Sequence, residues 1–343
     1  MKKILALILA LCMVFALAAC GSTPAPAATD APAEEPTDAP AEEPTDAPAE
    51  APAETVKIGM VTDTGGVNDK SFNQTSWEGL QALDPEVFEV NYLESKTDAD
   101  YQTNINTFID EGYDLIICVG YMLADATREA AEANPDQLFA IIDDATIDLP
   151  NVACLMFAQE QASYLVGLVA GSVTESKTVG YVQGMVSDSM NLFGIGFITG
   201  VLEACPEATV LQYNANSFGD IAGGSTAAKD MITKGADVIY HAAGGTGIGV
   251  ISACDEEGIW AIGVDTDQAS LAPEHVLTSA MKRVDVASQD IAKAVAEGSF
   301  TAGIHMYDLS NGGVDLAPTR DHIPAEVLEL VEAAKEAIIA GEK

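Results

Sequence analysis

The chain has 343 residues, of which 48% are hydrophobic and 20% charged, a composition typical of a globular protein long enough for two domains. Its formal net charge of −38 at pH 7 repels nucleic acids and anionic lipid surfaces. These values exclude a nucleic-acid partner and favour a neutral ligand over a phosphorylated one.

The N-terminus predicts a lipoprotein signal peptide over residues 1–19. Two lysines precede an apolar run over residues 4–17, which is short of the roughly 20 residues that a membrane-spanning helix needs. The sequence LAAC, ending at Cys20, matches a lipobox. We therefore expect cleavage before Cys20, a lipid on Cys20, and attachment at the outer face of the plasma membrane. An ordinary secretory signal with an incidental cysteine is the alternative.

Residues 20–55 predict a lipid-anchored, acidic, disordered tether. The segment consists almost wholly of Ala, Pro, Thr, Asp and Glu, with the unit DAPAEEPT starting at Asp30 and again at Asp38. Without large apolar side chains it cannot bury a core. An extended chain of this length reaches roughly 100 Å. Outside the signal peptide and tether, acidic residues still outnumber basic ones more than three to one.

The stretch at residues 57–80, KIGMVTDTGGVNDKSFNQTSWEGL, predicts a strand, a loop and a helix. Residues 58–61 form a short apolar run, and the sequence DTGG then opens a loop. Ser71 and Gln74 have the spacing of a capping box, so a helix should begin near Phe72. In an open α/β sheet, ligands bind outside the carboxyl ends of strands. Side chains of this loop and first helical turn should therefore reach a ligand.

The part of this stretch reading TDTGGVNDKSFNQTSWEGL resembles the opening signature of the basic membrane protein family of substrate-binding lipoproteins, which includes bacterial purine nucleoside receptors. The similarity continues to about Asp308. The resemblance implies the type I periplasmic-binding-protein fold. It also implies an ABC permease and an ATPase as partners.

Three residues of the stretch are candidates for ligand binding. By resemblance Asp63 binds the base, although an aspartate before glycines also caps turns through an Asx hydrogen bond. Phe72, at the first helical turn, is favoured for stacking on a ligand over a place in the core. Asn73 offers an amide that both donates and accepts. Asp69 is interpreted as a helix cap.

After this stretch, apolar runs alternate with helical patterns, which predicts parallel sheets of an α/β protein. The first series has strands at residues 87–93, 115–119, 138–142 and 152–156, with helices near 99–111 and 123–134. The second series has strands at residues 179–183, 209–213, 238–242, 260–264 and 276–281, with helices near 159–173, 190–205, 222–234, 247–257 and 285–297. Two series predict two Rossmann-like lobes.

The predicted lobes exchange the chain three times. We expect residues 56–157 plus about 282–303 in the N-terminal lobe, and residues 158–281 plus about 304–343 in the C-terminal lobe. The strands that precede Asp63 and Asp265 are alike, because each is apolar, contains a glycine and ends in aspartate. Each should direct a carboxylate into the cleft between the lobes.

A glycine loop in the second series admits two interpretations. The sequence HAAGGTG follows a strand and opens a helix, with Asp265 twenty residues after Gly245, which imitates a dinucleotide fingerprint and hence a dehydrogenase. The imitation fails at Val250, where the fingerprint requires glycine. The resemblance instead implies that backbone N–H groups around Gly244 contact the ligand, and that Asp265 accepts from ribose hydroxyls.

Further candidates come from the strand ends of both lobes. Lys282, in the family-like segment SAMKRVD, is our choice as donor to ribose hydroxyls. Phe218 should supply a second stacking ring, and Asp143 ends the strand at 138–142. Three helical glycines, Gly194, Gly196 and Gly200, are interpreted as close-packing positions.

The sequence offers neither a catalytic set nor a metal site. None of its four histidines adjoins a nucleophile elbow or a carboxylate pair, and no CxxC or Cys/His cluster is present. Cys118 and Cys154 lie in apolar strand-like runs and should be buried thiols, while disulfides among the four body cysteines stay open.

We expect a monomeric, non-enzymatic binding lipoprotein without cofactor that captures a purine nucleoside for an ABC importer. The alternatives are a receptor for a sugar or another heterocycle such as riboflavin, a surface adhesin or sensor without transport, and the dehydrogenase.

Overall fold

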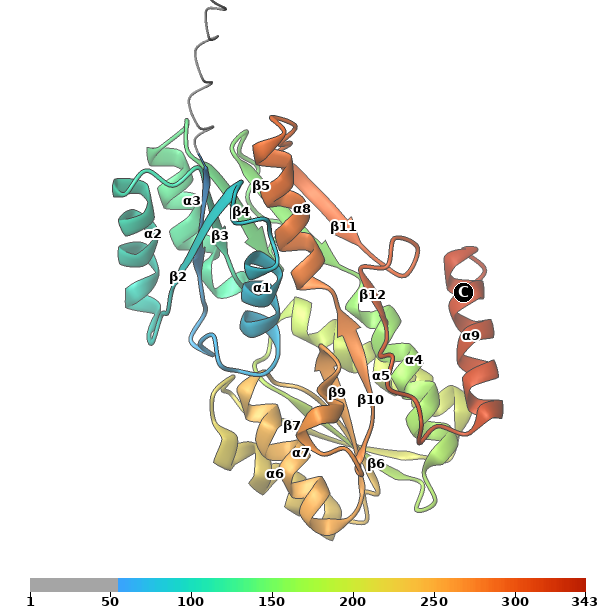
Figure 1. Ribbon diagram of the computed structural model, residues 1–343. Coiled ribbons are helices and arrows are strands. Elements are labelled where there is room, and N and C mark those ends of the chain that lie inside the picture. Colours follow the sequence, from blue (N-terminus) through green and yellow to red (C-terminus); the bar gives the residue numbers. More distant parts are fainter. Residues whose placement is uncertain (1–54) are drawn as a thin grey trace, which may run out of the picture. The chain divides into compact units, whose positions relative to one another are not determined.

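The computed structural model describes residues 55–343. The predicted signal peptide, Cys20 and all but the last residue of the tether lie outside the described residues. Within the described part, the strands form two six-stranded sheets, each covered by helices (Figure 1). Each sheet with its helices is called a lobe below. The predicted α/β architecture with two lobes built on parallel sheets is confirmed.

The sheet of the first lobe is parallel throughout, in the order β11-β5-β4-β3-β1-β2. Its strands are β1 Val56–Val61, β2 Phe88–Leu93, β3 Leu115–Cys118, β4 Leu138–Ile142, β5 Val152–Phe157 and β11 Gly303–Tyr307. Its helices are α1 Phe72–Gln81, α2 Tyr101–Asp110, α3 Ala124–Ala133 and α8 Val284–Ala296. Helices α1 and α8 pack on one face of the sheet, and α2 and α3 on the other.

The sheet of the second lobe has the order β12-β10-β9-β8-β6-β7 and is parallel except for β12, which runs antiparallel to β10. Its strands are β6 Thr178–Gln183, β7 Thr209–Asn214, β8 Val238–Ala242, β9 Trp260–Asp265, β10 Val276–Lys282 and β12 Val314–Leu316. Its helices are α4 Gln159–Val173, α5 Asp188–Ala204, α6 Ile221–Thr233, α7 Gly245–Glu257 and α9 Ala325–Ile339. Short 3₁₀ helices occur at η1 Asp98–Asp100, η2 Tyr121–Leu123 and η3 Gln268–Leu271.

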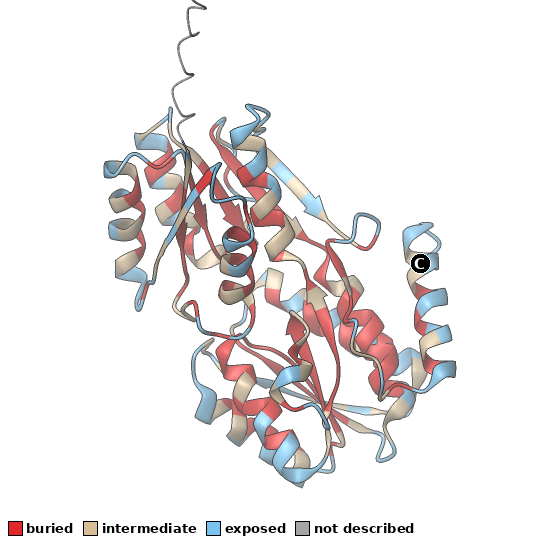
Figure 2. Cartoon of the chain, viewed as in Figure 1, coloured by how far each residue is buried: buried red, intermediate tan, exposed pale blue. Residues whose placement is uncertain are grey.

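The apolar runs of the sequence form strands because helices bury both of their faces. Figure 2 shows the central strands of both sheets as buried. All four residues of β3 and all five of β8, for instance, are buried. Continuous apolar runs of this kind are typical of parallel sheets covered on both sides. Every strand predicted from such a run is confirmed, with ends shifted by a residue or two.

The sequence interpretation missed β11, β12 and α9. In β11, Ile304 and Met306 are 63% and 52% exposed, and His305 separates them, so this edge strand has no continuous apolar run. It pairs with β5 in the first sheet. By sheet membership, the third crossing between the lobes follows Tyr307.

The two sheets match in strand order, and the match adds a third aspartate to the two whose strands are alike in sequence. Strand β9 occupies in its sheet the place that β4 has in the first sheet, whereas β1 corresponds to β6. The counterpart of Asp265 is therefore Asp143, and not Asp63. Asp143 directly follows β4, and Asp265 is the last residue of β9. Both have a left-handed backbone conformation, with φ of 67° for Asp143 and 66° for Asp265.

Candidate functional site

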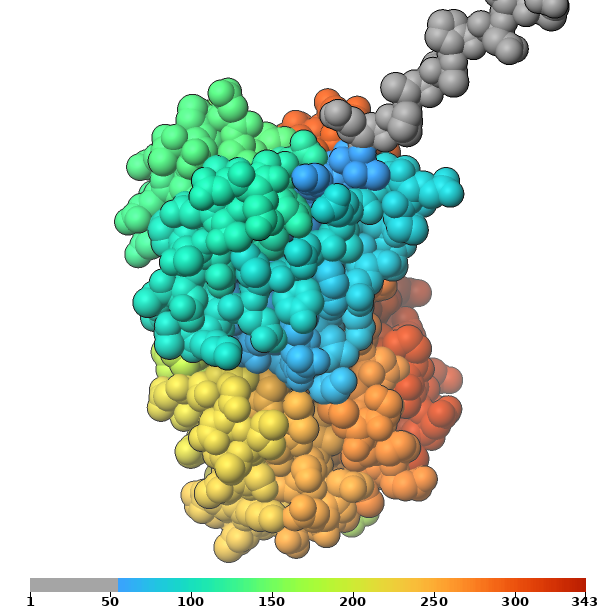
Figure 3. All heavy atoms as spheres, turned by 60° about the vertical axis from the view of Figure 1, so that its left-hand side comes forward, coloured from blue at the N-terminus to red at the C-terminus, as the bar shows by residue number. Residues whose placement is uncertain are grey.

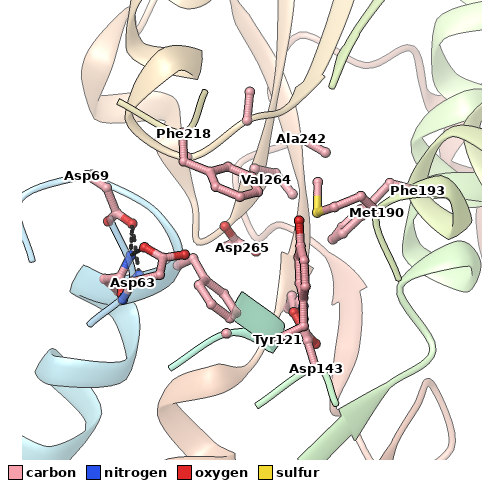
Figure 4. Close-up of a pocket in the computed structure, with 16 residues that line it drawn as sticks. Asp63, Asp69, Tyr121, Asp143, Met190, Phe193, Phe218, Ala242, Val264 and Asp265 are labelled. Carbon is pink, nitrogen blue, oxygen red and sulfur yellow. Dashed lines mark hydrogen bonds and ion pairs between the residues drawn. The ribbon is translucent and has the colours of Figure 1, made fainter. Parts of the chain in front are cut away.

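A cavity lies where the carboxyl ends of the strands of the two lobes face each other. Figure 3 shows first-lobe atoms, in blue and cyan, meeting second-lobe atoms, in yellow and orange. Asp63, Phe72 and Asn73 come from the first lobe, and Phe218, Gly244, Asp265 and Lys282 from the second; all seven predicted site residues line this cavity (Figure 4). The seven residues predicted from the sequence to bind the ligand therefore line one cavity.

Asp63, which follows β1, forms the Asx turn considered for it and also lines the cavity. Its Oδ1 accepts hydrogen bonds from the backbone N–H of Gly65 at 2.8 Å, as an Asx turn requires, and from Nδ2 of Asn73 at 2.8 Å. Its Oδ2 has no hydrogen-bond donor among residues 55–343. Burial of the carboxylate raises the pKa of Asp63 to about 6.

The amide of Asn73 is committed to two carboxylates. Nδ2 donates to Asp63 at 2.8 Å and to Asp69 at 3.0 Å, and Oδ1 accepts from the backbone N–H of Asp63 at 3.3 Å. Both amide hydrogens are therefore used within the protein. The predicted donor role of Asn73 toward a ligand does not fit this geometry, because its amide instead fixes the orientation of the Asp63 carboxylate.

Helix α1 is capped by Asp69, whose carboxylate accepts from the backbone N–H groups of Ser71 and Asn73 at 2.9 Å and of Gln74 at 3.1 Å. The predicted capping box of Ser71 and Gln74 is wrong, since the Ser71 side chain makes no cap hydrogen bond. Its hydroxyl donates instead to Oδ2 of Asp265, in the other lobe.

Asp265 ends β9 and is 4% exposed. Desolvation on burial raises the pKa of Asp265 to about 7, while the Lys282 charge and the Ser71 hydrogen bond lower it. With Oδ2 held by Ser71, Oδ1 is left for another donor. Asp63 and Asp265 thus present one carboxylate from each lobe to the same cavity, and each has one oxygen without a donor among the described residues.

Lys282, at the end of β10, is 2% exposed and its ammonium donates to Oδ2 of Asp143, at the end of β4 in the first lobe. The same ammonium lies 4.9 Å from the ring centroid of Phe72 and 5.4 Å from that of Phe193. Oδ1 of Asp143 is buried and has no partner among the described residues. One of the three N–H groups of the Lys282 ammonium is therefore committed to a buried ion pair across the cleft, and the other two have no acceptor among the described residues.

Aromatic and apolar side chains form the rest of the wall. Figure 4 shows Phe218 entering from the second lobe and Tyr121 rising from η2 of the first, with Met190 and Phe193 on α5 beside it. Sequence reasoning missed these last three residues. Tyr121 follows β3 and was accessible to the strand-end rule. Met190 and Phe193 carried no signal, because their apolar spacing on α5 equally fits a core helix.

The glycine loop after β8 offers consecutive backbone donors at Gly244 and Gly245. Gly244 has φ of 53°, a conformation that favours glycine, and its N–H has no acceptor among residues 55–343. Gly245 N–H also has no acceptor among the described residues, whereas Thr246 N–H donates to the carbonyl of Phe218 and Gly247 N–H to that of Gly244. The loop departs from a dinucleotide fingerprint at Val250, which is fully buried where that fingerprint requires glycine.

The part of the chain that the structure describes contains four cysteines. Cys118, Cys154 and Cys254 are buried free thiols, and Cys205 is also free. Residues 55–343 contain no group of three or more His, Cys, Asp or Glu arranged to hold a metal ion. No helix in this part is both long and apolar enough to cross a membrane.

Comparisons with known proteins agree with this architecture. Residues 56–342 match the family model described as ABC transporter substrate-binding protein PnrA-like. The chain is 40% identical over 308 residues to a CD4+ T-cell-stimulating antigen of Listeria monocytogenes, covering 83% of this chain and 86% of that protein. It is 38% identical over 310 residues to an ABC transporter nucleoside-binding protein of Lactococcus lactis, covering 83% and 88%.

A solved structure gives the same result for the fold. The crystal structure of an ABC transporter solute-binding protein from Aeropyrum pernix superposes with a TM-score of 0.77 at 26% identity, over 84% of this chain and 92% of that one. The two parallel sheets with interleaved helices are thus the type I periplasmic-binding-protein fold. The chain belongs to the PnrA-like family of ABC transporter substrate-binding proteins.

Proposed function

We propose that this protein is a lipid-anchored extracytoplasmic receptor that binds a purine nucleoside between its lobes and delivers it to an ABC permease with its ATPase. The observation that carries the proposal is a cavity to which each lobe presents a carboxylate, Asp63 or Asp265, and a phenyl ring, Phe72 or Phe218. The name of the Lactococcus relative, a nucleoside-binding protein, supports the same ligand class.

Each part of a nucleoside has a complementary group in this cavity. Phe72 and Phe218 offer apolar faces to a planar base, and base–aromatic stacking is worth about 1–3 kcal/mol per base in nucleic-acid complexes. The free oxygen of Asp63 suits an N–H on the purine edge, because a carboxylate only accepts. Asp265, beside the ion-paired Lys282 and the free Gly244 N–H, suits the ribose hydroxyls.

The proposal is tested with a panel of affinities for guanosine, inosine, adenosine, the free bases and ribose, measured by titration calorimetry. Asp63→Asn should change the ranking of the bases, because a mismatched buried polar group costs about 1–3 kcal/mol. Asp265→Ala should weaken all nucleosides alike and abolish their advantage over free bases. Asp136→Asn, at an exposed position, is the control. Failure of the unmutated protein to bind any nucleoside would refute the proposal.

The membrane attachment rests on the lipobox before Cys20, which lies outside the described residues. The mature protein should begin at an acylated Cys20. Cys20→Ala should release the protein from the membrane fraction or leave its signal peptide uncleaved, as measured by cell fractionation and N-terminal mass spectrometry. A mature unmutated protein that is recovered unacylated, with a different N-terminus, contradicts the anchor.

A further inference from the structure

We propose that Gln268 is a positioning residue that joins the two halves of the ligand site across the cleft and slows opening of the lobes. It extends the proposed function to a residue that does not line the cavity. Only the choice of ligand used in the test depends on the nucleoside proposal, since the contacts that support Gln268 are formed entirely within the protein.

In the second lobe, the Gln268 side chain holds the strand end that carries Asp265. Gln268 begins η3 and is 1% exposed. Its Oε1 accepts from the backbone N–H of Val264 at 2.9 Å and lies 3.0 Å from Nε2 of His241. A side chain at Gly263 would have its Cβ 2.6 Å from this oxygen. The close approach of the amide therefore depends on glycine at that position.

The same amide reaches the first lobe. A backbone N–H can only donate, so Val264 fixes which end of the amide is the oxygen. The NH₂ group then faces Lys70, and Nε2 donates to the Lys70 carbonyl at 2.8 Å. Lys70 has φ of 56°, an uncommon conformation for a residue other than glycine, and directly precedes Ser71.

Two hydrogen bonds from the second lobe thus meet one turn of the first. Gln268 binds the carbonyl of Lys70, and Asp265 accepts from the hydroxyl of Ser71. This turn leads directly into α1, whose first residues are Phe72 and Asn73. Opening of the cleft must break both bonds, and it separates Asp265 from the stacking ring. We infer that Gln268 couples lobe closure to completion of the ligand site.

The test variant is Gln268→Glu, which keeps the length of the side chain and the oxygen that accepts from Val264 and His241. It replaces the donor that faces Lys70 with a second oxygen. The matched control is Gln183→Glu, since Gln183 is also buried, at 6% exposure, and its Nε2 donates to the Met185 carbonyl at 2.8 Å and to Asn191 at 3.1 Å. Both of those partners lie in the second lobe, so the control breaks no contact across the cleft.

The first measurement is the dissociation rate of inosine from the purified protein by stopped-flow fluorescence. We expect the rate to rise about tenfold in Gln268→Glu and to stay within twofold of the unmutated protein in Gln183→Glu. Equal rates in the two variants would overturn the proposal.

The second measurement is small-angle X-ray scattering of each protein without added nucleoside. Gln268→Glu should have a larger radius of gyration than Gln183→Glu, and equal radii would overturn the proposal. If inosine does not bind the unmutated protein, the nucleoside proposal fails while scattering still decides the role of Gln268.

If Gln268→Glu does not fold, Ser71→Ala breaks the neighbouring cross-cleft bond and is expected to raise both the dissociation rate and the radius of gyration. Ser76→Ala is its control, because Ser76 bonds to Ser288 within the first lobe.

Discussion

At the scale of single residues, the site keeps two carboxylates in an unfavourable state. Asp63 and Asp265 are each about 95% buried, and burial raises their pKa values to about 6 and about 7, from an ordinary value of 3.8. Carboxylates whose pKa values are raised by burial are concentrated at functional sites. In each case the protein supplies donors to one oxygen and leaves the other free, so a ligand that donates to the free oxygen recovers part of the desolvation cost.

The raised pKa values predict how stability changes with pH. Between about pH 4 and pH 7 the folded protein binds more protons at Asp63 and Asp265 than the unfolded chain does, so the free energy of unfolding should fall as pH rises through this window. Asp63→Asn removes one of these titrations. Its melting temperature should exceed that of the unmutated protein at pH 7 and equal it at pH 4. Calorimetric scans at both pH values test this, with Asp136→Asn as control; an equal gain at both pH values contradicts it.

At the scale of elements, most of the fold was predictable because each buried strand corresponds to a short apolar run in the sequence. The four-residue run of β3 and the five-residue run of β4 are examples. The failures occur where local signals are ambiguous. The spacing of Ser71 and Gln74 fits a capping box, yet Asp69 supplies the cap and leaves the Ser71 hydroxyl for Asp265. Spacing along the chain cannot reveal that the Ser71 hydroxyl donates to a carboxylate 194 positions away.

The packing of α4 against α5 gives a prediction at this scale, because glycines let the two backbones approach closely. A Cβ at Gly200 would lie 2.2 Å from the carbonyl oxygen of Tyr164, and one at Gly196 would lie 2.1 Å from that of Glu160. The interpretation of these glycines as close-packing positions is therefore confirmed. Gly200→Ala should lower the free energy of unfolding by about 2 kcal/mol.

Urea denaturation measures this loss. Thr199→Ala, at the exposed neighbouring position on the same helix, is the control and should stay within about 0.5 kcal/mol of the unmutated protein. A gain in stability for Gly200→Ala, as helix propensity alone predicts, would show that the helices can move apart at little cost.

At the scale of the whole molecule, the site exists only where the two lobes meet, and the sequence is least informative there. Strand ends identified which residues face the cleft, but the pairing of Lys282 with Asp143, across 139 positions, depends on how the lobes approach each other. The hydrogen bonds from Asn73 to Asp63 and Asp69 could not be predicted for a related reason. An amide near two carboxylates and a ligand has several possible partners, and only the packed geometry selects among them.

The charge of the closed cavity leads to the last prediction. Four carboxylates, Asp63, Asp69, Asp143 and Asp265, line it together with the single ammonium of Lys282. A phosphate placed about 8 Å from one excess negative charge is repelled by roughly 2 kcal/mol per unit charge at an effective dielectric constant of about 20. Inosine 5′-monophosphate should therefore bind at least 100-fold more weakly than inosine at pH 8, where Asp63 and Asp265 are ionised.

Competition calorimetry at pH 8 and pH 5 tests this selectivity. At pH 5 both carboxylates gain protons and the phosphate loses part of its charge, so the ratio of the two affinities should shrink. Raising the salt concentration should change the ratio little, because buried charges are screened much less than exposed ones. Equal affinities at pH 8 would contradict a cavity that selects by charge, whereas a ratio that is independent of pH would mean that steric exclusion, not the carboxylates, rejects the phosphate.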